Sequence, residues 1–322
     1  MNKKKYYRSP LFYVGDKYKL LKEIKPLFPT NIKRFIEPFT GGGSVFMNIN
    51  TNELLLNDID PYVFKIHLFL IEQAKNKNLF FDRIKQMIYK YGLSRSYIED
   101  IVPQELKEKY IKTYFAKFNK NAFKKLKEDF NKEKEKDILK LYLLLIYGFN
   151  RMLRFNSKAE YNLPVGNVDF NKNVFDALND YFWVINHKKI KFYNLDFIEF
   201  LDIVKPTIND FVYLDPPYLI TFSEYNKLWN EKKEKALIGY LDTLNRNNIK
   251  FAISNVTHYK GKVNNIFLNW AQKYNIEKIK SNYISYHDNS NKKFEEVLVF
   301  NYEPENKKYK QTKLLFSNEK EN

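Results

Sequence analysis

Residues 32–47 read IKRFIEPFTGGGSVFM, and this stretch decides the fold. An apolar run ends at Phe39, and three consecutive glycines follow at 41–43, out of only nine in the chain. Glycine lets the backbone turn tightly or approach a ligand closely. The pattern predicts a strand, a tight turn and a helix, which is how a nucleotide-binding α/β sheet begins. A plain turn accounts for the glycines equally well.

Strand-like segments recur on both sides of a long helical stretch. We expect strands at 53–56, 189–197, 210–218, 249–256, 276–286 and 295–302, and a helix at 230–247. The last two strands read as a hairpin around HDNSNKKF. Residues 62–148 have a helical pattern, and the charged part, 117–137, suits a solvated helix face or a loop. Residues 156–158 suit a turn between two short strands, and the lysine-rich tail after Glu305 suits disorder.

Four polar or glycine positions directly follow predicted strands. They are Gly41–Gly43, Asp58, Asp196 and Asp215. Open α/β sheets bind ligands at the carboxyl ends of their strands, so we expect these residues to line one cleft. Asp58 follows the glycines by roughly 20 residues, where an acid typically accepts hydrogen bonds from ribose hydroxyls. A helix N-cap is the alternative, although Asp60 fits that role better.

The strongest chemical motif is Asp215-Pro216-Pro217-Tyr218, after the apolar run FVYL. Two prolines fix two φ angles and remove two backbone donors, so the loop is rigid. The Asp215 carboxylate and the Pro216 carbonyl can each accept one N–H of an exocyclic amine, while Tyr218 can stack on a flat base. Such a loop suits methyl transfer to that amine, which depends on positioning and charge placement. A structural Pro-Pro turn is the alternative.

The composition is strongly basic and rich in aromatic residues. Lys and Arg outnumber Asp and Glu by 55 to 38, and the net charge is +17. This favours a polyanionic partner, nucleic acid first and an acidic membrane surface second. Codon drift in an AT-rich genome explains part of the lysine content. The 44% hydrophobic content supports a substantial buried core rather than disorder.

Missing residue types exclude several kinds of chemistry. The chain has no cysteine, which excludes disulfides, thiolate metal sites and cytosine carbon-5 methylation through a thiolate. Its four histidines are far apart in sequence, so we expect no catalytic metal. The basic N-terminus lacks the apolar stretch of a signal peptide, and the most apolar run, 139–149, is too short to span a bilayer. We expect a soluble, cytoplasmic protein without membrane contact.

Five motifs in order give the chain a family resemblance. FYVGDKYKLL (12–21), FIEPFTGGGSVF (35–46), LLLNDID (54–60), NLDF (194–197) and FVYLDPPY (211–218) resemble Dam-type DNA adenine-N6 methyltransferases, the alpha group. The resemblance implies an α/β fold: a Rossmann-like class I methyltransferase sheet with an inserted, mostly helical DNA target-recognition domain. The catalytic domain that binds S-adenosylmethionine would comprise 1–65 and 170–305, the recognition domain 66–169, and the basic tail 306–322.

The resemblance also implies residue roles. Asp215, Pro216, Pro217 and Tyr218 would be catalytic. The cofactor S-adenosyl-L-methionine would be bound by Tyr13, Lys17, Glu37, Phe39, Gly41, Gly43, Asp58, Asp196, Phe197 and Asp215. Double-stranded DNA would be bound by Phe149, Asn150, Arg154, Asn156 and Pro164, with the Phe149 ring wedged beside a flipped base. Arg154 suits a guanine edge, with a phosphate as the alternative. The family often has Trp at the position of Tyr13 and Gly at that of Asp16.

The resemblance leaves rival functions to be weighed. RNA methyltransferases share the Asp-Pro-Pro-Tyr tetrapeptide, but the insertion between the two halves argues against them. Protein glutamine methyltransferases usually begin that tetrapeptide with Asn, and Asp215 counts against them. A non-catalytic DNA-binding protein on the same fold would have no need of Asp215 or the glycines. We expect a monomer that belongs to a restriction-modification system or to a phage. In the first case its partner, functional and not physical, is a cognate restriction endonuclease.

Overall fold

The computed structural model describes residues 6–221, 229–279 and 294–305. The chain divides into two compact units, each described here by itself. Unit 1 comprises residues 1–18, 40–49 and 58–194, and unit 2 comprises residues 19–39, 50–57 and 195–322. The recognition domain expected at 66–169 falls inside unit 1, and its boundaries stay a prediction.

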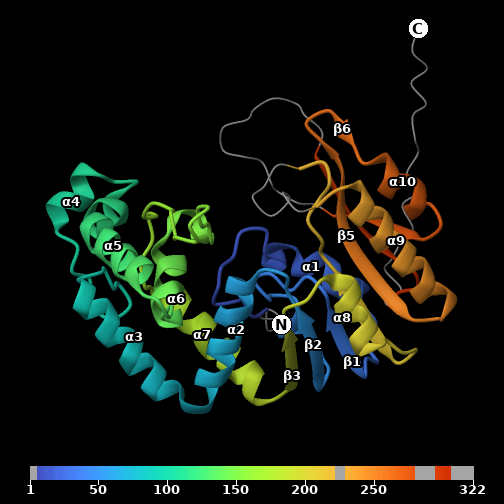
Figure 1. Ribbon diagram of the computed structural model, residues 1–322, viewed down its shortest axis with the longest axis horizontal. Helices are drawn as coiled ribbons and strands as arrows, with labels where there is room; N and C mark the ends of the chain where they lie inside the picture. The colour runs from blue at the N-terminus through green and yellow to red at the C-terminus, as the bar shows by residue number, and fades with distance from the viewer. Residues whose placement is uncertain (1–5, 222–228, 280–293, 306–322) are drawn as a thin grey trace, which may run out of the picture. The chain divides into compact units, whose positions relative to one another are not determined.

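Unit 2 contains a mixed sheet that begins with parallel strands (Figure 1). Its strands are β1 (Arg34–Glu37), β2 (Glu53–Asn57), β4 (Asp210–Leu214), β5 (Lys250–Tyr259), β6 (Lys262–Val263), β7 (Asn275–Ile279) and β8 (Glu295–Phe300). Their order is β2-β1-β4-β5-β8-β7, with β6 paired to β5. The pairs β2–β1, β1–β4 and β4–β5 are parallel, while β8 is antiparallel to both β5 and β7. The α/β class expected from the sequence is confirmed.

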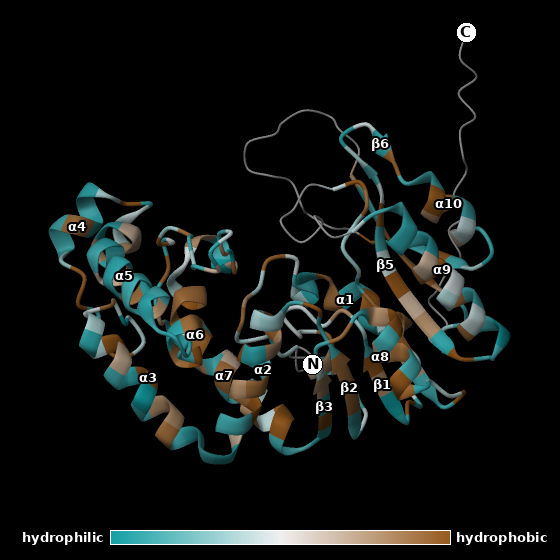
Figure 2. Ribbon diagram, in the orientation of Figure 1, coloured by the Kyte–Doolittle hydropathy of each residue, from teal (hydrophilic) through white to brown (hydrophobic). Residues whose placement is uncertain are grey.

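Burial explains which strands lie at the centre of this sheet. All five residues of β4 are buried, as expected for a strand with a neighbour on each side and both faces covered. The helices are α8 (Phe197–Val204), α9 (Glu231–Arg246) and α10 (Asn265–Ala271). Helix α8 packs against β2, and α9 and α10 pack against β5 and each other. Strands β1 and β2 are coloured as hydrophobic in Figure 2, in keeping with their burial.

Unit 1 is mainly helical. It contains α2 (Pro61–Gln73), α3 (Lys77–Tyr91), α4 (Gln104–Lys109), α5 (Tyr114–Lys132), α6 (Ile138–Tyr147), α7 (Lys172–Asn186) and the strand β3 (Lys189–Tyr193). Helix α6 packs against α2 and α5. Nine of its ten residues are buried, so it forms the centre of the helical core. The charged α5 buries only one stripe, as an amphipathic helix does.

Short helical turns connect these elements. They are η1 (Lys17–Leu20), α1 (Leu21–Ile24), η2 (Lys25–Leu27), η3 (Phe46–Asn48), η4 (Ala74–Asn76) and η5 (Phe149–Arg151). The regular helix expected after the glycines is wrong, because only the turn η3 forms there. The Ser44 carbonyl, which a continuing α-helix would bond to the Asn48 amide, instead accepts the Asn48 side-chain amide at 2.7 Å. The Asn48 amide bonds to Val45 instead.

Three further expectations are corrected or limited by the structure. The strand at 189–197 stops at Tyr193, because Asp196 caps α8 by accepting a hydrogen bond from the Ile198 amide. The two short strands around 156–158 are reduced to an isolated bridge between Phe155 and Tyr161. Strand β7 is described only to Ile279, so the remainder to 286, the hairpin loop and the tail after 305 lie outside the described residues.

None of the described helices combines the length and apolarity that crossing a bilayer needs. Within the same residues, no cluster of His, Asp and Glu could hold a metal ion.

Candidate functional site

The glycine turn of unit 1 (residues 40–45) is built from tight backbone contacts. Gly43 has φ +88°, and a Cβ at this position would lie 2.4 Å from the Phe46 ring, so only glycine fits. Gly41 has φ +50°, and a Cβ there would meet nothing within 4 Å. The Gly43 amide donates to the Thr40 carbonyl at 2.9 Å and closes the turn. One side of the turn is therefore tightly packed, while Gly41 faces open space.

Asp58 ties this turn to the start of α2. Its Oδ2 accepts a hydrogen bond from the Gly41 amide at 2.7 Å, and its Oδ1 accepts one from the Asp60 amide at 2.9 Å. Burial outweighs these bonds and raises the pKa of Asp58 to about 7. Asp60 itself caps α2, accepting bonds from the amides of Tyr62 and Val63, as the sequence predicted. Asp58 is thus not the helix cap, and a carboxylate has capacity for further donors.

His67 supports the same turn from α2, and sequence reasoning did not find it. Its side chain is fully buried, with Nε2 2.9 Å from the Gly41 carbonyl and Nδ1 2.9 Å from the Tyr181 hydroxyl. A carbonyl only accepts, so Nε2 carries the hydrogen and Nδ1 accepts from Tyr181. Burial lowers the pKa of His67 to about 4, so the ring is neutral at pH 7. A lone histidine in a helix gives no sequence signal for this role.

The segment around Asp16 packs directly on the glycine turn. The Ser44 hydroxyl lies 2.7 Å from Asp16 Oδ2, and the Tyr18 amide donates to Oδ1 at 2.8 Å. A Cβ added at Gly42 would lie 3.0 Å from that Oδ2 and 3.1 Å from the Tyr13 Cβ. Burial raises the pKa of Asp16. Asp16 therefore fastens the N-terminal turn to the glycine turn.

Tyr13 and Lys17, both predicted cofactor residues, are buried in unit 1. Lys17 Nζ lies 3.4 Å from the Gly15 carbonyl. Five predicted cofactor residues of unit 1 therefore lie on three chain segments, 13–18, 40–45 and 58–60. The contact of Asp16 and Tyr13 with Gly42, together with the Asp58–Gly41 bond, brings these segments together.

The Asp-Pro-Pro-Tyr loop of unit 2 follows the buried strand β4 directly. The Tyr218 hydroxyl lies 2.8 Å from Asp215 Oδ1 and 3.2 Å from Oε1 of Glu296, which is buried on β8. Sequence reasoning gave Tyr218 a stacking role and did not include Glu296. The structure adds a hydrogen-bonding role, because Tyr218 holds the Asp215 carboxylate in one orientation.

Two predicted cofactor residues of unit 2, Phe39 and Phe197, form an aromatic cluster with Trp229. The rings of Phe39, Phe197 and Trp229 have centroids 5.4–5.7 Å apart. The Trp229 indole N–H donates to Glu234 at 2.7 Å. Glu234 is fully buried and also accepts from two asparagine side chains, Asn255 and Asn264, each at 3.0 Å. Burial raises its pKa.

Two further predicted cofactor residues of unit 2, Asp196 and Glu37, lie at the start of α8 and at the end of β1. Asp196 caps α8 and forms an ion pair with Lys233 at 3.4 Å, while Glu37 is buried at the end of β1. The single cleft expected for the glycines, Asp58, Asp196 and Asp215 stays a prediction.

The predicted DNA-binding residues lie on the loop 148–166 of unit 1. The Phe149 side chain is 48% exposed, and Asn150 and Pro164 are exposed as well. The Phe149 amide donates to the Pro164 carbonyl at 2.9 Å, which joins the two ends of the loop. A Cβ at Gly166 would lie 2.6 Å from the Gly148 carbonyl oxygen, so these ends approach as closely as glycine allows.

The remaining predicted DNA-binding residues are partly held by this loop. Arg154 Nε donates to the Asn162 side-chain oxygen at 2.8 Å. The Asn156 side chain accepts from the amides of Lys158 and Glu160, both at 3.0 Å, and so shapes the turn. Asn156 therefore organises the loop in this structure.

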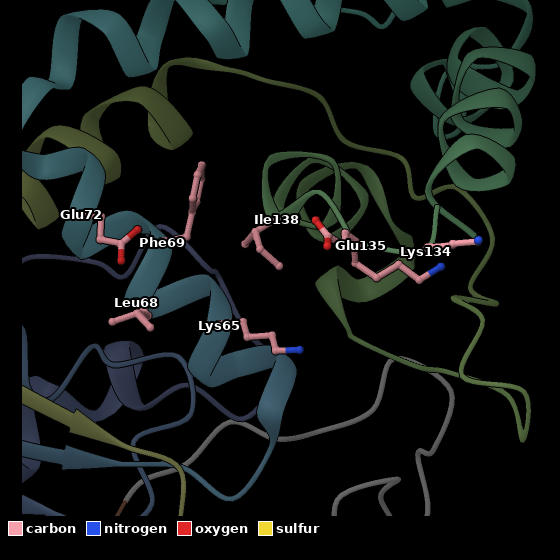
Figure 3. A pocket seen from close by; sticks show the side chains of 8 residues that line it. Lys65, Leu68, Phe69, Glu72, Lys134, Glu135 and Ile138 are labelled. Carbon is pink, nitrogen blue, oxygen red and sulfur yellow. The ribbon is translucent and has the colours of Figure 1, made fainter. Parts of the chain in front are cut away.

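A surface pocket of about 480 Å³ lies elsewhere on unit 1 (Figure 3). Its walls come from α2 and from the segment leading into α6. They are formed by Lys65, Leu68, Phe69, Glu72, Lys134, Glu135, Lys136 and Ile138. None of these is a predicted site residue, and the mixed charges indicate no single ligand.

Comparison with known proteins agrees with the motifs. A model of the family D12 class N6 adenine-specific DNA methyltransferase matches residues 13–284. The chain is 35% identical over 306 residues to type II methyltransferase M.FokI of Planomicrobium okeanokoites, which covers 92% of this chain and 43% of the relative. It is 34% identical over 311 residues to modification methylase StsI of Streptococcus sanguinis, covering 93% and 44%.

A shorter relative matches over a smaller part of the chain. The DNA adenine methylase of Haemophilus influenzae is 30% identical over 223 residues, covering 68% of this chain and 67% of the relative. The chain spans less than half the length of M.FokI and StsI. The family resemblance seen in the five motifs is confirmed. Because the family model covers most of its length, the chain belongs to the D12 class N6 adenine-specific DNA methyltransferases.

Proposed function

We propose that this chain transfers a methyl group from S-adenosyl-L-methionine to N6 of an adenine in duplex DNA, as the modification enzyme of a restriction system. The observation that carries the proposal is the Asp215 loop. It follows a fully buried strand, contains two consecutive prolines, and holds its carboxylate by the Tyr218 hydroxyl at 2.8 Å. A catalytic group needs this kind of fixed orientation.

Asp215 and Pro216 act on the target amine. Its nitrogen is a weak nucleophile because its lone pair is delocalised into the purine ring. The Asp215 carboxylate has capacity for about four hydrogen bonds, so the Tyr218 bond leaves room for an amine N–H. The Pro216 carbonyl accepts the second N–H. Together they favour a pyramidal nitrogen that carries developing positive charge, which is stronger binding of the transition state than of the flat ground state.

The proton balance of the reaction assigns a second task to Asp215. The nitrogen forms one bond to the methyl carbon as the carbon–sulfur bond breaks, and the positive charge passes to the amine. One amine proton must then leave, and the carboxylate that already accepts this N–H takes it. Tyr218 keeps the carboxylate oriented through the transfer.

The residues of unit 1 fit a nucleoside-containing cofactor. Gly41 faces open space with a left-handed backbone, so a ligand can approach this turn closely. Asp58 is fixed by two backbone amides and retains acceptor capacity for ribose hydroxyls. We place Tyr13, Lys17, Gly41, Gly43 and Asp58 on the cofactor, together with Glu37, Phe39, Asp196, Phe197 and Asp215. When bound, S-adenosylmethionine supplies an electrophilic methyl group on a sulfonium.

The loop 148–166 is the proposed DNA-recognition element, within a target-recognition domain at 66–169 of a Rossmann-like catalytic domain. An adenine amine inside a base pair is inaccessible, so the base must flip out before reaction. The exposed Phe149 ring suits insertion beside the flipped base, and Asn150, Arg154, Asn156 and Pro164 suit contacts with bases or backbone.

The biological setting is proposed from the names of the relatives. M.FokI is named a type II methyltransferase and StsI a modification methylase, which supports a restriction endonuclease as functional partner. The family name specifies DNA, which favours DNA over the RNA alternative. We further propose that the chain acts as a cytoplasmic monomer.

The test is methyl transfer from S-adenosylmethionine labelled in its methyl group. The purified chain is incubated with unmethylated genomic DNA and, separately, with RNA. We expect label in DNA and none in RNA, and loss of the DNA label with Asp215→Ala. Transfer to RNA alone, or a folded protein that binds the cofactor but never labels DNA, would refute the proposal.

A further inference from the structure

Two arginine side chains of unit 1 lie against one aromatic ring. The guanidinium carbons of Arg8 and Arg151 are 4.4 Å and 4.1 Å from the centre of the Phe12 ring. A guanidinium is attracted to a ring face, which accounts for each contact taken singly. Bringing two positive charges to the same ring is unfavourable, because like charges repel. Burial, followed by the charge of Arg8, lowers the pKa of Arg151 to about 10, so it stays charged at pH 7.

Neither arginine is in direct contact with a carboxylate in the described part of the chain, although Arg8 interacts electrostatically with Asp16 and Arg151 with Asp169. Arg8 and Arg151 form no ion pair there, whereas Arg34 is held by Asp210 at 2.6 Å and Arg95 by Glu99 at 3.0 Å. The Nε of Arg151 is buried and has no hydrogen-bond partner among the described residues. A buried donor on a charged group is costly unless a partner is supplied. The guanidinium groups of this pair therefore suit a ligand that brings negative charge to them.

The backbone under this pair is strained as well. Phe12, Asn150 and Arg151 have φ values of +49°, +54° and +50°, in the left-handed region that favours glycine. Strain of this kind collects at ligand-binding sites, where the surrounding structure enforces it. The Arg151 amide donates to the Gly148 carbonyl at 3.1 Å, which fixes the turn and the direction of its side chain. The same turn presents the exposed Phe149 ring.

We propose that Arg8 and Arg151 together bind one phosphodiester of the DNA backbone next to the target adenine. The inference rests on the proposed function, because it takes duplex DNA as the substrate. A phosphodiester carries one negative charge on two unbridged oxygens, so it can accept N–H donors from both guanidiniums. A carboxylate of the cofactor has similar chemistry. The phosphodiester is favoured because Arg151 directly follows Phe149 and Asn150, the residues proposed to enter the DNA.

This pair would position DNA rather than read its sequence. Phosphate contacts set the register of a protein on the duplex and carry no direct sequence information. Arg8 and Arg151 therefore complement Arg154, whose proposed contact is with a base edge. The net charge of +17 indicated a polyanionic partner but not which residues bind it.

Three variants test the pair. Arg151→Gly removes the guanidinium and suits the left-handed backbone, so we expect it to fold at least as well as the wild type. Arg8→Gln removes the other charge. The matched control is Arg83→Gln, which removes an exposed arginine of α3 that contacts only the Gln73 side chain in the described structure.

The measurement is fluorescence anisotropy of a labelled random-sequence duplex over a range of salt concentrations. We expect each site variant to bind about tenfold to a hundredfold more weakly at low salt. The slope of log affinity against log salt should fall by about one, as for one lost phosphate contact. Arg83→Gln should behave as the wild type. Equal slopes and affinities for Arg151→Gly and Arg83→Gln would overturn the proposal.

A second measurement distinguishes a DNA phosphodiester from the carboxylate of the cofactor as the anion bound by the pair. Calorimetry with S-adenosylmethionine should give the same affinity for Arg151→Gly and the wild type. A loss confined to cofactor affinity would assign the pair to the cofactor's carboxylate and overturn the phosphate site. Neither assay requires methyl transfer, so failure of the phosphate site is distinguishable from failure of the proposed function, which the labelling experiment alone decides.

Discussion

The glycine turn of unit 1 and the Asp-Pro-Pro-Tyr loop of unit 2 are both turns that follow a strand of a parallel pair, yet they are made rigid in different ways. In the glycine turn, the side chains of Asp58 and His67 bond to the backbone of Gly41. In the other loop, two prolines fix the backbone, and Asp215 bonds to another side chain, Tyr218. The backbone of the first turn is thus held by side chains, whereas the backbone of the second is held by its prolines and displays a carboxylate.

This comparison separates the expected consequences of mutation. Changes in the glycine turn should alter stability and cofactor affinity. Changes in the Asp215 loop should mainly alter the rate of the chemical step and leave DNA binding and stability nearly intact.

Asp215→Ala should produce the largest effect. Loss of one preorganised partner of the transition state lowers kcat by about 10²–10³, or about 3–4 kcal/mol. Steady-state methyl transfer to DNA measures this, with DNA affinity by anisotropy and thermal unfolding as controls. Near wild-type kcat would show that the loop is only structural.

Gly43→Ala should destabilise unit 1 by about 3 kcal/mol. Its φ of +88° is unfavourable for alanine, and the new Cβ would lie 2.4 Å from the Phe46 ring. Gly41→Ala is the matched control, because its Cβ meets nothing within 4 Å and only about 1–2 kcal/mol of backbone cost remains. Urea unfolding measures both free energies. Equal losses for the two variants would contradict the packing difference between the two sides of the turn.

His67 should make the protein less stable as the pH falls. Its pKa is about 4 in the folded chain against 6.5 for the free side chain, so the unfolded state takes up the proton first. Between pH 6.5 and 4 the unfolding free energy should fall by up to about 3 kcal/mol. The difference between the wild type and His67→Gln isolates this contribution, because other groups titrate in both. A difference that is independent of pH would show that His67 does not titrate on unfolding.

Asp58 should make cofactor binding depend on pH near neutrality. Its pKa is raised to about 7, and ribose hydroxyls donate best to the ionised carboxylate. Affinity for S-adenosylmethionine should therefore weaken as the pH falls below 7, by up to about tenfold per unit. Asp58→Asn should lose this dependence, and a proton on the cofactor itself affects both proteins equally. If calorimetry gives the same pH dependence of affinity for the wild type and Asp58→Asn, Asp58 does not bind the ribose.

Tyr218→Phe should produce the smallest effect. Phenylalanine keeps the ring for stacking and removes the hydroxyl, with its 2.8 Å bond to Asp215 and its 3.2 Å contact with Glu296. We expect a fall in kcat of about fivefold, or about 1 kcal/mol, with an unchanged KM. Tyr218→Ala, which also removes the ring, should cost more. If phenylalanine matches the wild type while alanine does not, stacking alone is the role of Tyr218.

The local pattern of the sequence predicted the elements and motifs well where short-range physics decides them. The strand before the glycines, the capping role of Asp60 and the helical stretch after Pro61 depend on burial periodicity and on hydrogen bonds between near neighbours. The helix expected after the glycines failed because Asn48 reaches back to the Ser44 carbonyl, and propensity gives no hint of such a bond.

Contacts between distant segments could not be predicted. His67 and Gly41 are 26 residues apart, and Arg151 lies 139 positions after Phe12 in the chain, so no local pattern links either pair. Asp16 looked like a defect in a family motif, and only the fold shows it bonded to Ser44. The roles of the site residues came from the family resemblance, which indicates the positions of functional residues but not the side chains that they contact in the fold.

If Asp215 directs a methyl group to N6 of adenine, the methylated base in DNA must depend on its carboxylate. Duplex DNA is treated with the wild type or with Asp215→Ala, digested to nucleosides, and analysed by mass spectrometry. We expect N6-methyladenine with the wild type and a yield at least about a hundredfold lower, at equal times, with the variant. Methylation at N4 of cytosine, or N6-methyladenine formed equally by both proteins, would contradict it.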